Sequence, residues 1–291
     1  MGKKFVFAIS STVLVFAAVL MTQLYFALAP VNLARASLFR PVKVAEYKLP
    51  DKIMALPLQH LKFKSKNGNT LYGVRIEKPG AKYTFLCHGG QGGNLNMNIA
   101  LAYTALMAGQ SVFLYDYQGF GKSTGRPSCV GVVDNGLSAH DYLVGNCGIK
   151  PERIVQYGVS LGTGVAAAVA EKRTTAGVAL FCPYVSLHRV AREDCPFLNI
   201  YPESLFPQPD LGAARFVATN SSVPILVWHG AKDPLIKVSH ALDLQRLDHG
   251  NLLLCIEQDK EHGGWTKEGL ADKMKEFLAR LEDKQALLSQ R

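Results

Sequence analysis

A glycine-flanked serine is the feature that most restricts how this chain can fold. Residues 158–162 read Gly-Val-Ser-Leu-Gly, between an apolar run at 154–157 and a run of small residues at 163–170. This pattern at a strand-to-helix junction is typical of a sharp turn that exposes the serine hydroxyl. The glycines leave room for strand and helix to approach closely. Ser160 is therefore the candidate nucleophile, and the first N–H groups of the following helix point toward its target.

Strand and helix signals alternate along the rest of the chain. Residues 62–66 and 70–76 flank Asn67-Gly68, which predicts a β-hairpin. Further strands are predicted over 83–87, 111–115, 154–157, 176–181, 225–228 and 252–256, and helices over 95–108, 130–146, 163–170 and 267–288. This order predicts an α/β fold, a mostly parallel eight-stranded sheet with helices on both faces. Ligands bind beyond the carboxyl ends of such strands, so each site residue should follow a strand.

The serine needs a base, and the base needs an acid that orients it. His262 follows the last predicted strand and precedes two glycines, whereas His249 precedes that strand and His240 falls within a predicted helix. Asp233 stands in the turn after the strand at 225–228 and is the candidate acid. The acids that fail the strand-end condition are Glu203, Asp210, Asp243 and Asp248.

A glycine-rich loop supplies candidate donors for a developing oxyanion. Residues 88–94 read His-Gly-Gly-Gln-Gly-Gly-Asn and follow a predicted strand. We expect the backbone N–H groups of Gly90 and Leu161 to bind the oxyanion, with Gly89 or Gln91 as alternatives to Gly90. The loop lacks the ending of a phosphate-binding P-loop and does not match the dinucleotide fingerprint. The histidine that opens the loop is expected to brace it.

The N-terminus has a different character from the rest. Residues 5–29 carry no charge and number 25 (29 − 5 + 1), enough for a helix to cross a bilayer core of roughly 30 Å. A cleaved signal has an apolar region of only about 7–15 residues. We predict a signal anchor, a transmembrane helix, over residues 1–29, with a cleaved signal and secretion as the alternative. A proline-containing tether over 30–58 would lead into a domain over 59–291.

Charge bears on orientation and partners. Lys3-Lys4 before the apolar run favour an inside N-terminus, and Arg35 and Arg40 after it favour the opposite. We predict a membrane location with the domain outside the cytoplasm, a cytoplasm-facing domain being the alternative. The net charge of +9 is spread without a basic cluster, which argues against a nucleic-acid partner and favours an anionic lipid surface. The oligomeric state stays open.

The six cysteines form no C-x-x-C pair, which excludes the common zinc and thioredoxin patterns. No metal and no cofactor are predicted. Cys129 with Cys147, or Cys182 with Cys195, could pair in an oxidising compartment, and the sequence leaves this open.

The motifs, taken in chain order, resemble those of the α/β-hydrolase superfamily. They are His88-Gly89-Gly90, the turn at 116–123, residues 158–162, Asp233 and His262, within a match from about residue 60 to 285. The chain is most similar to membrane-anchored α/β-hydrolase-domain proteins with small caps. The resemblance implies a serine hydrolase that cleaves esters or thioesters, acyl or lipid-like, through an acyl-enzyme. Ser160, Asp233 and His262 would form its triad.

Residues 183–215 are rich in proline and apolar side chains and are predicted to form a short, irregular cap. Its apolar residues could line an acyl pocket or simply pack on the sheet. Two other functions stay open at this point. One is a peptidase or amidase with the same triad, and the other is a non-catalytic binding module that kept the fold.

Overall fold

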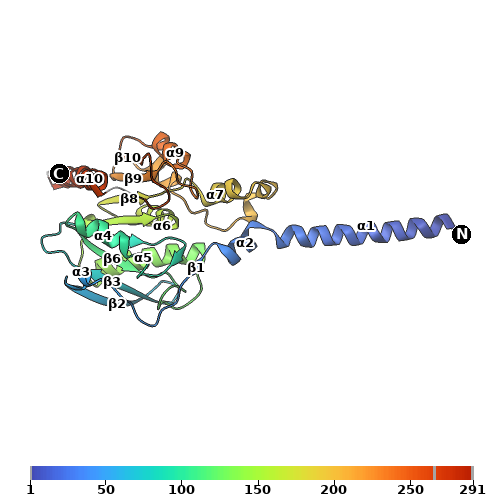
Figure 1. Cartoon of the computed structure of the whole chain (residues 1–291), viewed down its shortest axis with the longest axis horizontal. Coiled ribbons are helices and arrows are strands. Elements are labelled where there is room, and N and C mark those ends of the chain that lie inside the picture. Colours follow the sequence, from blue (N-terminus) through green and yellow to red (C-terminus); the bar gives the residue numbers. More distant parts are fainter. Residues whose placement is uncertain (1, 265–266, 290–291) are drawn as a thin grey trace.

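Eight strands form one sheet in the order β10-β9-β8-β7-β4-β6-β3-β2 (Figure 1). The computed structural model describes residues 2–264 and 267–289. The strands of the sheet are β2 (Leu58–Lys64), β3 (Thr70–Ile76), β4 (Thr84–His88), β6 (Ser111–Tyr115), β7 (Ile154–Val159), β8 (Gly177–Phe181), β9 (Ile225–Gly230) and β10 (Leu252–Glu257). Two short strands, β1 (Arg40–Pro41) and β5 (Gly92–Gly93), pair with each other outside it.

The sheet is mixed because one strand is reversed. β3 runs antiparallel to β2 and β6, and the other neighbouring pairs are parallel. The prediction of an α/β fold with eight strands is confirmed, and the hairpin at Asn67-Gly68 accounts for the reversal. The carboxyl ends of β4, β7, β8, β9 and β10 therefore meet at one edge.

Helices cover both faces of the sheet. The α-helices of the described residues are α1 (Gly2–Ala27), α2 (Pro30–Ser37), α3 (Asp51–Met54), α4 (Ile99–Met107), α5 (Cys129–Gly145), α6 (Leu161–Ala170), α7 (Leu187–Asp194), α8 (Ala214–Thr219), α9 (Ser239–Leu247) and α10 (Lys267–Ser289), of which α4, α5, α6, α8, α9 and α10 pack on the sheet. Phe85 of β4 packs in one core layer with α4 and α10, and its neighbour Leu86 packs in the opposite layer with α5 and α6. α8 and α9 complete the second face. This alternation is the two-residue period of a strand covered on both sides.

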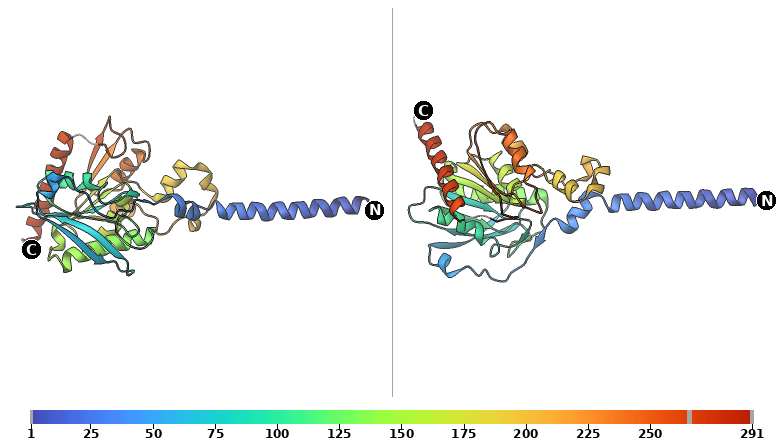
Figure 2. Two further views of the ribbon diagram at one scale, coloured as in Figure 1. Left: turned by 60° about the horizontal axis from the view of Figure 1, so that its bottom comes forward. Right: turned by 45° about the horizontal axis from the view of Figure 1, so that its top comes forward.

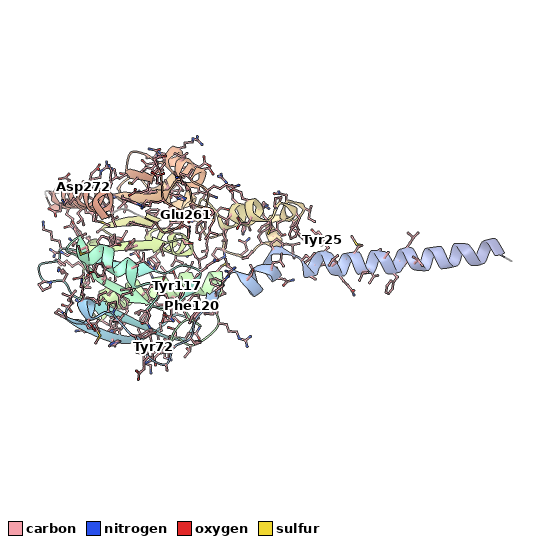
Figure 3. All side chains as sticks on the ribbon, viewed as in Figure 1. Tyr25, Tyr72, Tyr117, Phe120, Glu261 and Asp272 are labelled. Carbon is pink, nitrogen blue, oxygen red and sulfur yellow. The ribbon has the colours of Figure 1, made fainter. Side chains whose placement is uncertain are left out.

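The N-terminal helix meets the rest of the molecule at the cap. α1 projects away from the sheet, and α7 lies beside its base (Figures 1 and 2). Tyr25, labelled in Figure 3, stacks on Tyr201 of the cap with ring centroids 4.6 Å apart. The Tyr201 hydroxyl also donates to the carbonyl of Tyr25 at 2.9 Å. The buried cap residues Leu198 and Phe206 thus pack with α1 and α2.

The predicted transmembrane helix over residues 1–29 is not supported. Within the described part of the chain, no helix combines the length and the apolar character that a membrane crossing requires. The side chains of residues 2–12, which belong to the predicted span, lie outside the described part. The extracytoplasmic location and the lipid partner stay predictions.

The segment predicted as a tether, residues 30–58, holds α2, β1 and α3 and contacts the domain. Arg40 pairs with Gly92 in a short parallel ladder. Further along, the Tyr47 hydroxyl donates to Asp116 Oδ2 at 2.6 Å and Lys43 Nζ donates to the carbonyl of Ser123 at 2.7 Å. The predicted domain boundaries stay a prediction.

Some predicted elements differ from the structure, among them the first hairpin strand, which spans Leu58–Lys64 rather than 62–66. α4 begins at Ile99 rather than at residue 95, because residues 94–98 form a turn in which Asn94 Oδ1 accepts the N–H of Asn96 at 3.0 Å. The cap was expected to be irregular, yet it contains α7, whose N-cap Ser186 accepts the N–H of Arg189. Such a cap satisfies an otherwise unpaired N–H at the helix start.

All six cysteines, which lie in the described residues, are free thiols. Neither of the two pairings left open by the sequence, Cys129 with Cys147 or Cys182 with Cys195, is formed.

The glycine at the start of α6 permits this helix to cross β4 closely. A Cβ added to Gly162 would lie 2.1 Å from the carbonyl oxygen of His88. We expect Gly162→Ala to lower the free energy of unfolding by about 1–3 kcal/mol or more, since backbone must shift to relieve the overlap. Urea unfolding measures this change.

Gly145 is the matched control. It also lies in a helix, but a Cβ there would meet nothing within 4 Å. Gly145→Ala should be neutral or stabilising by about 0.5–1 kcal/mol. Equal unfolding energies for the two variants would contradict the account of the crossing.

Candidate active site

Ser160 lies at the junction of β7 and α6 with a strained backbone. Its φ of 52° and ψ of −123° are a conformation that non-glycine residues rarely adopt. The Ser160 N–H donates to the carbonyl of Phe181 at 2.9 Å, and its own carbonyl accepts the N–H of Thr163 at 2.9 Å. These bonds hold the serine at the helix start, with its side chain partly exposed.

The flanking glycines, Gly158 and Gly162, explain how β7 and α6 can approach each other closely at this turn. A Cβ on Gly158 would lie 2.3 Å from the carbonyl oxygen of Gly162, on the other side of the turn. Any larger residue at either position would push α6 away from the sheet. The pattern read from the sequence is thus a packing requirement of the turn.

Asp233 and His262 are brought together from the loops after β9 and β10. His262 Nδ1 lies 2.7 Å from Asp233 Oδ2. The other carboxylate oxygen of Asp233 accepts the N–H groups of Leu235 and Ile236 at 2.8 and 2.9 Å. The Asp233 side chain is fully buried, whereas the His262 side chain is 21% exposed. The carboxylate is therefore held rigidly, and the imidazole can reach a substrate.

The surroundings of Asp233 and His262 favour a charged carboxylate and a charged imidazole. Burial raises the pKa of Asp233, but the hydrogen bonds from His262 and from the backbone N–H groups more than offset it and leave that pKa lowered. Burial lowers the pKa of His262, yet the Asp233 carboxylate and the nearby Cys182 sulfur leave it raised above 6.5. An imidazole beside a buried carboxylate accepts a proton more readily than a free one.

No hydrogen bond joins Ser160 Oγ to His262 within residues 2–264 and 267–289. Such catalytic bonds are often long before substrate binds. The two residues are linked through β8 instead, because Phe181 accepts the Ser160 N–H and the next residue, Cys182, accepts the N–H of Gly263 at 3.2 Å.

The glycine loop after β4 lies against the serine. A Cβ added to Gly90 would be 3.9 Å from the Cβ of Ser160. Leu161 is the first residue of α6, so its N–H is one of the unpaired donors of a helix start. Gly90 and Leu161, the two predicted oxyanion donors, therefore flank Ser160.

His88 braces this loop from beneath. It is fully buried. Its Nδ1 lies 2.8 Å from the Tyr115 hydroxyl and its Nε2 lies 3.0 Å from Gln156 Oε1. Burial lowers the pKa of His88 to about 4, so the ring is neutral. Both ring nitrogens are occupied, which agrees with the structural role expected for this histidine.

Cys182 is the site residue that the sequence did not reveal. It is buried, with 1% exposure. The Sγ atom of Cys182, a carboxylate oxygen of Asp233 and a ring nitrogen of His262 lie within 4.8 Å of one another. Sulfur, carboxylate and imidazole are the ligands that zinc prefers. Here the ligand atoms already take part in hydrogen bonds: His262 bonds to Asp233, and Cys182 Sγ accepts the N–H of Gly263. Hydrogen bonding thus accounts for the cluster without a metal.

Similar proteins were found by sequence, although no family model matches the chain. An uncharacterized protein of Mycobacterium tuberculosis (strain ATCC 25618 / H37Rv) is 33% identical over 147 residues, which are 50% of this chain and 51% of that protein. Alpha/beta hydrolase domain-containing protein 17B of Xenopus tropicalis is 33% identical over 184 residues, 62% of this chain and 61% of that protein. The chain thus matches only about half to three fifths of the length of these relatives.

Solved structures share the fold at low sequence identity. The esterase Pf2001 of Pyrococcus furiosus superposes with a TM-score of 0.69 and 19% identity, covering 84% of this chain and 98% of that chain. Acetyl xylan esterase 1 from Thermoanaerobacterium gives a TM-score of 0.59 and 15% identity, covering 79% and 90%. The sheet order and these solved structures show that the chain has the α/β-hydrolase fold, and its sequence is similar over about three fifths of its length to a relative named alpha/beta hydrolase.

Proposed function

We propose that this protein is a serine hydrolase that cleaves carboxylic esters or thioesters of acyl or lipid-like substrates. The observation that carries the proposal is the 2.7 Å contact of His262 with buried Asp233, at the sheet edge where the strained Ser160 also lies. Hydrolysis as the general reaction is also supported by the relatives named hydrolase or esterase. Each residue then has one role.

Ser160 is the nucleophile and His262 the base. Because Nδ1 of His262 is bonded to Asp233, its Nε2 is the atom free to take the proton of the Ser160 hydroxyl. The oxygen attacks the substrate carbonyl, and His262 returns the proton to the leaving group as the acyl-enzyme forms. A water molecule, deprotonated by the same Nε2, then releases the acid. Asp233 holds the tautomer and stabilises the charged ring.

The N–H groups of Leu161 and Gly90 bind the negative oxygen of the tetrahedral intermediate. Leu161 contributes the donor at the start of α6, where the helix dipole also favours negative charge. Gly90 contributes the second donor from the loop after β4. The absence of a side chain at Gly90 lets substrate approach this backbone closely.

We also propose the acyl class of substrate from an apolar cavity of about 570 Å³ between α4 and α10, whose lining includes none of the triad or oxyanion residues. The cavity extends from Ile99 and Leu270, near the starts of the two helices, to Met107 and Leu278. α4 follows the oxyanion loop and α10 follows the base loop. A hydrocarbon chain in this cavity would remove apolar surface from water.

Replacing the nucleophile tests the proposal. We expect Ser160→Ala to reduce kcat for p-nitrophenyl esters by about 10⁶-fold, because a methyl group cannot form the acyl-enzyme. Release of p-nitrophenol by the purified full chain measures this loss. Ser221→Ala, at an exposed serine, is the control and should keep the wild-type rate.

Undiminished turnover by Ser160→Ala would contradict the proposal. The cleavage rates of ester, thioester and peptide substrates that share one acyl group then show which leaving group the enzyme prefers. Faster cleavage of the peptide than of the ester would favour a peptidase. Rates that rise with acyl chain length would support the acyl class.

The pH dependence follows from the raised pKa of His262. The ring must be neutral to accept a proton, so activity is lost as pH falls through this pKa. Burial opposes the charged ring, but Asp233 and then Cys182 outweigh it. We therefore expect kcat/KM to rise with pH along a limb whose midpoint lies above 6.5. Asp233→Asn should move the midpoint down and lower kcat by ~10⁴-fold. A wild-type midpoint at or below 6.5 would contradict this reasoning.

A further inference from the structure

The last residue of β8 and the residue that follows it are hydrogen-bonded to all three segments that carry the proposed triad. The carbonyl of Phe181 accepts the N–H of Ser160 at 2.9 Å. Cys182 donates its N–H to the carbonyl of Trp228 at 2.8 Å, in the strand that leads to the acid. Cys182 Sγ accepts the N–H of Gly263 at 3.2 Å, next to the base. Two consecutive residues therefore tie the nucleophile, acid and base loops together.

We propose that Cys182 is a positioning residue, whose sulfur fixes the loop and the ring of His262 relative to Asp233. The inference rests on the proposed function, because it assigns a role within that triad. Cys182 would not touch the substrate, since it is 1% exposed. Its effect would reach the reaction through the imidazole alone.

The backbone of Cys182 supports a role beyond filling space. Its φ of 50° is left-handed, and apart from Ser160 it is the one non-glycine residue with a positive φ in residues 2–264 and 267–289. Such a conformation costs energy and persists only where neighbouring contacts hold it. Glycine would adopt it without strain, but glycine has no acceptor for the Gly263 N–H. The strained angle directs a sulfur atom at the base loop.

The sulfur contacts the His262 loop at Gly263, the residue that directly follows the base. Gly263 has a φ of +73°, and its N–H donates to Cys182. The titratable groups that face the ring are Asp233 and His229 from the β9 side and Cys182 from β8. Burial and the Asp233 hydrogen bond have the largest effects on the pKa of His262. The Cys182 sulfur comes next and raises that pKa. Removal of the sulfur should therefore lower that pKa and loosen the loop.

Three single variants of the full chain test the role. Cys182→Ala removes the acceptor, Cys182→Ser keeps a smaller acceptor, and Cys255→Ala removes a partly buried thiol in β10 that packs against the core layer of α4 and α10. The readouts are kcat per active site, counted by fluorophosphonate titration, and the protonation midpoint of the His262 imidazole, measured by NMR.

We expect Cys182→Ala to lower kcat per titrated site roughly 3- to 10-fold with little change in KM, as loss of one hydrogen bond predicts. Its His262 midpoint should move to lower pH. Cys182→Ser should lie between this variant and wild type, and Cys255→Ala should match wild type in both readouts.

An unchanged His262 midpoint in Cys182→Ala would overturn the inference, whatever happens to the rate. Fewer titratable sites with unchanged kcat per site would overturn it too, because the thiol would then serve only folding. Failure of the proposed function looks different: wild type itself would hydrolyse no ester. The NMR midpoint would still test the contact in that case.

Discussion

The close crossing of α6 over β4 is the constraint on which the site depends. A Cβ at Gly162 would overlap the carbonyl of His88, so only a residue without Cβ fits there. This contact fixes the start of α6, which in turn holds Ser160 in its strained conformation and aims the Leu161 N–H outward. It also brings the glycine loop after β4 beside the serine. One packing requirement therefore sets both the nucleophile and its oxyanion donors.

The parallel strands supply the remaining geometry. β4, β7, β8, β9 and β10 end at one edge, so loops far apart in sequence converge there. The Asp233 carboxylate is buried and fully hydrogen-bonded, which makes it a fixed reference for the His262 ring. Ser160 and Cys182, each with a positive φ, directly follow the neighbouring strands β7 and β8, so two strained residues stand at adjacent strand ends. A well-packed sheet can hold such strain where a surface loop could not.

Part of the fold and of the candidate site could be predicted from local sequence patterns. The strands, the turn around Ser160 and the strand-end positions of Asp233 and His262 follow from periodicity and chain order, which a single sequence carries. The role of Cys182 does not, because it depends on a left-handed φ and on contact with Gly263, 81 residues away. The start of α4 differs from the prediction because the Asn94 turn competes with the helix. The packing of Tyr25 on the cap likewise needs three-dimensional neighbours that spacing does not encode.

The central claim is that Ser160 is an activated nucleophile held beside the His262–Asp233 pair. Mass spectrometry of the full chain after treatment with a fluorophosphonate tests it most directly, because the reagent forms a covalent bond with an activated serine. We expect a single adduct on the peptide that contains Ser160, and this adduct should disappear in His262→Ala. A folded wild-type protein that takes up no label at Ser160, or labels equally without His262, would contradict it.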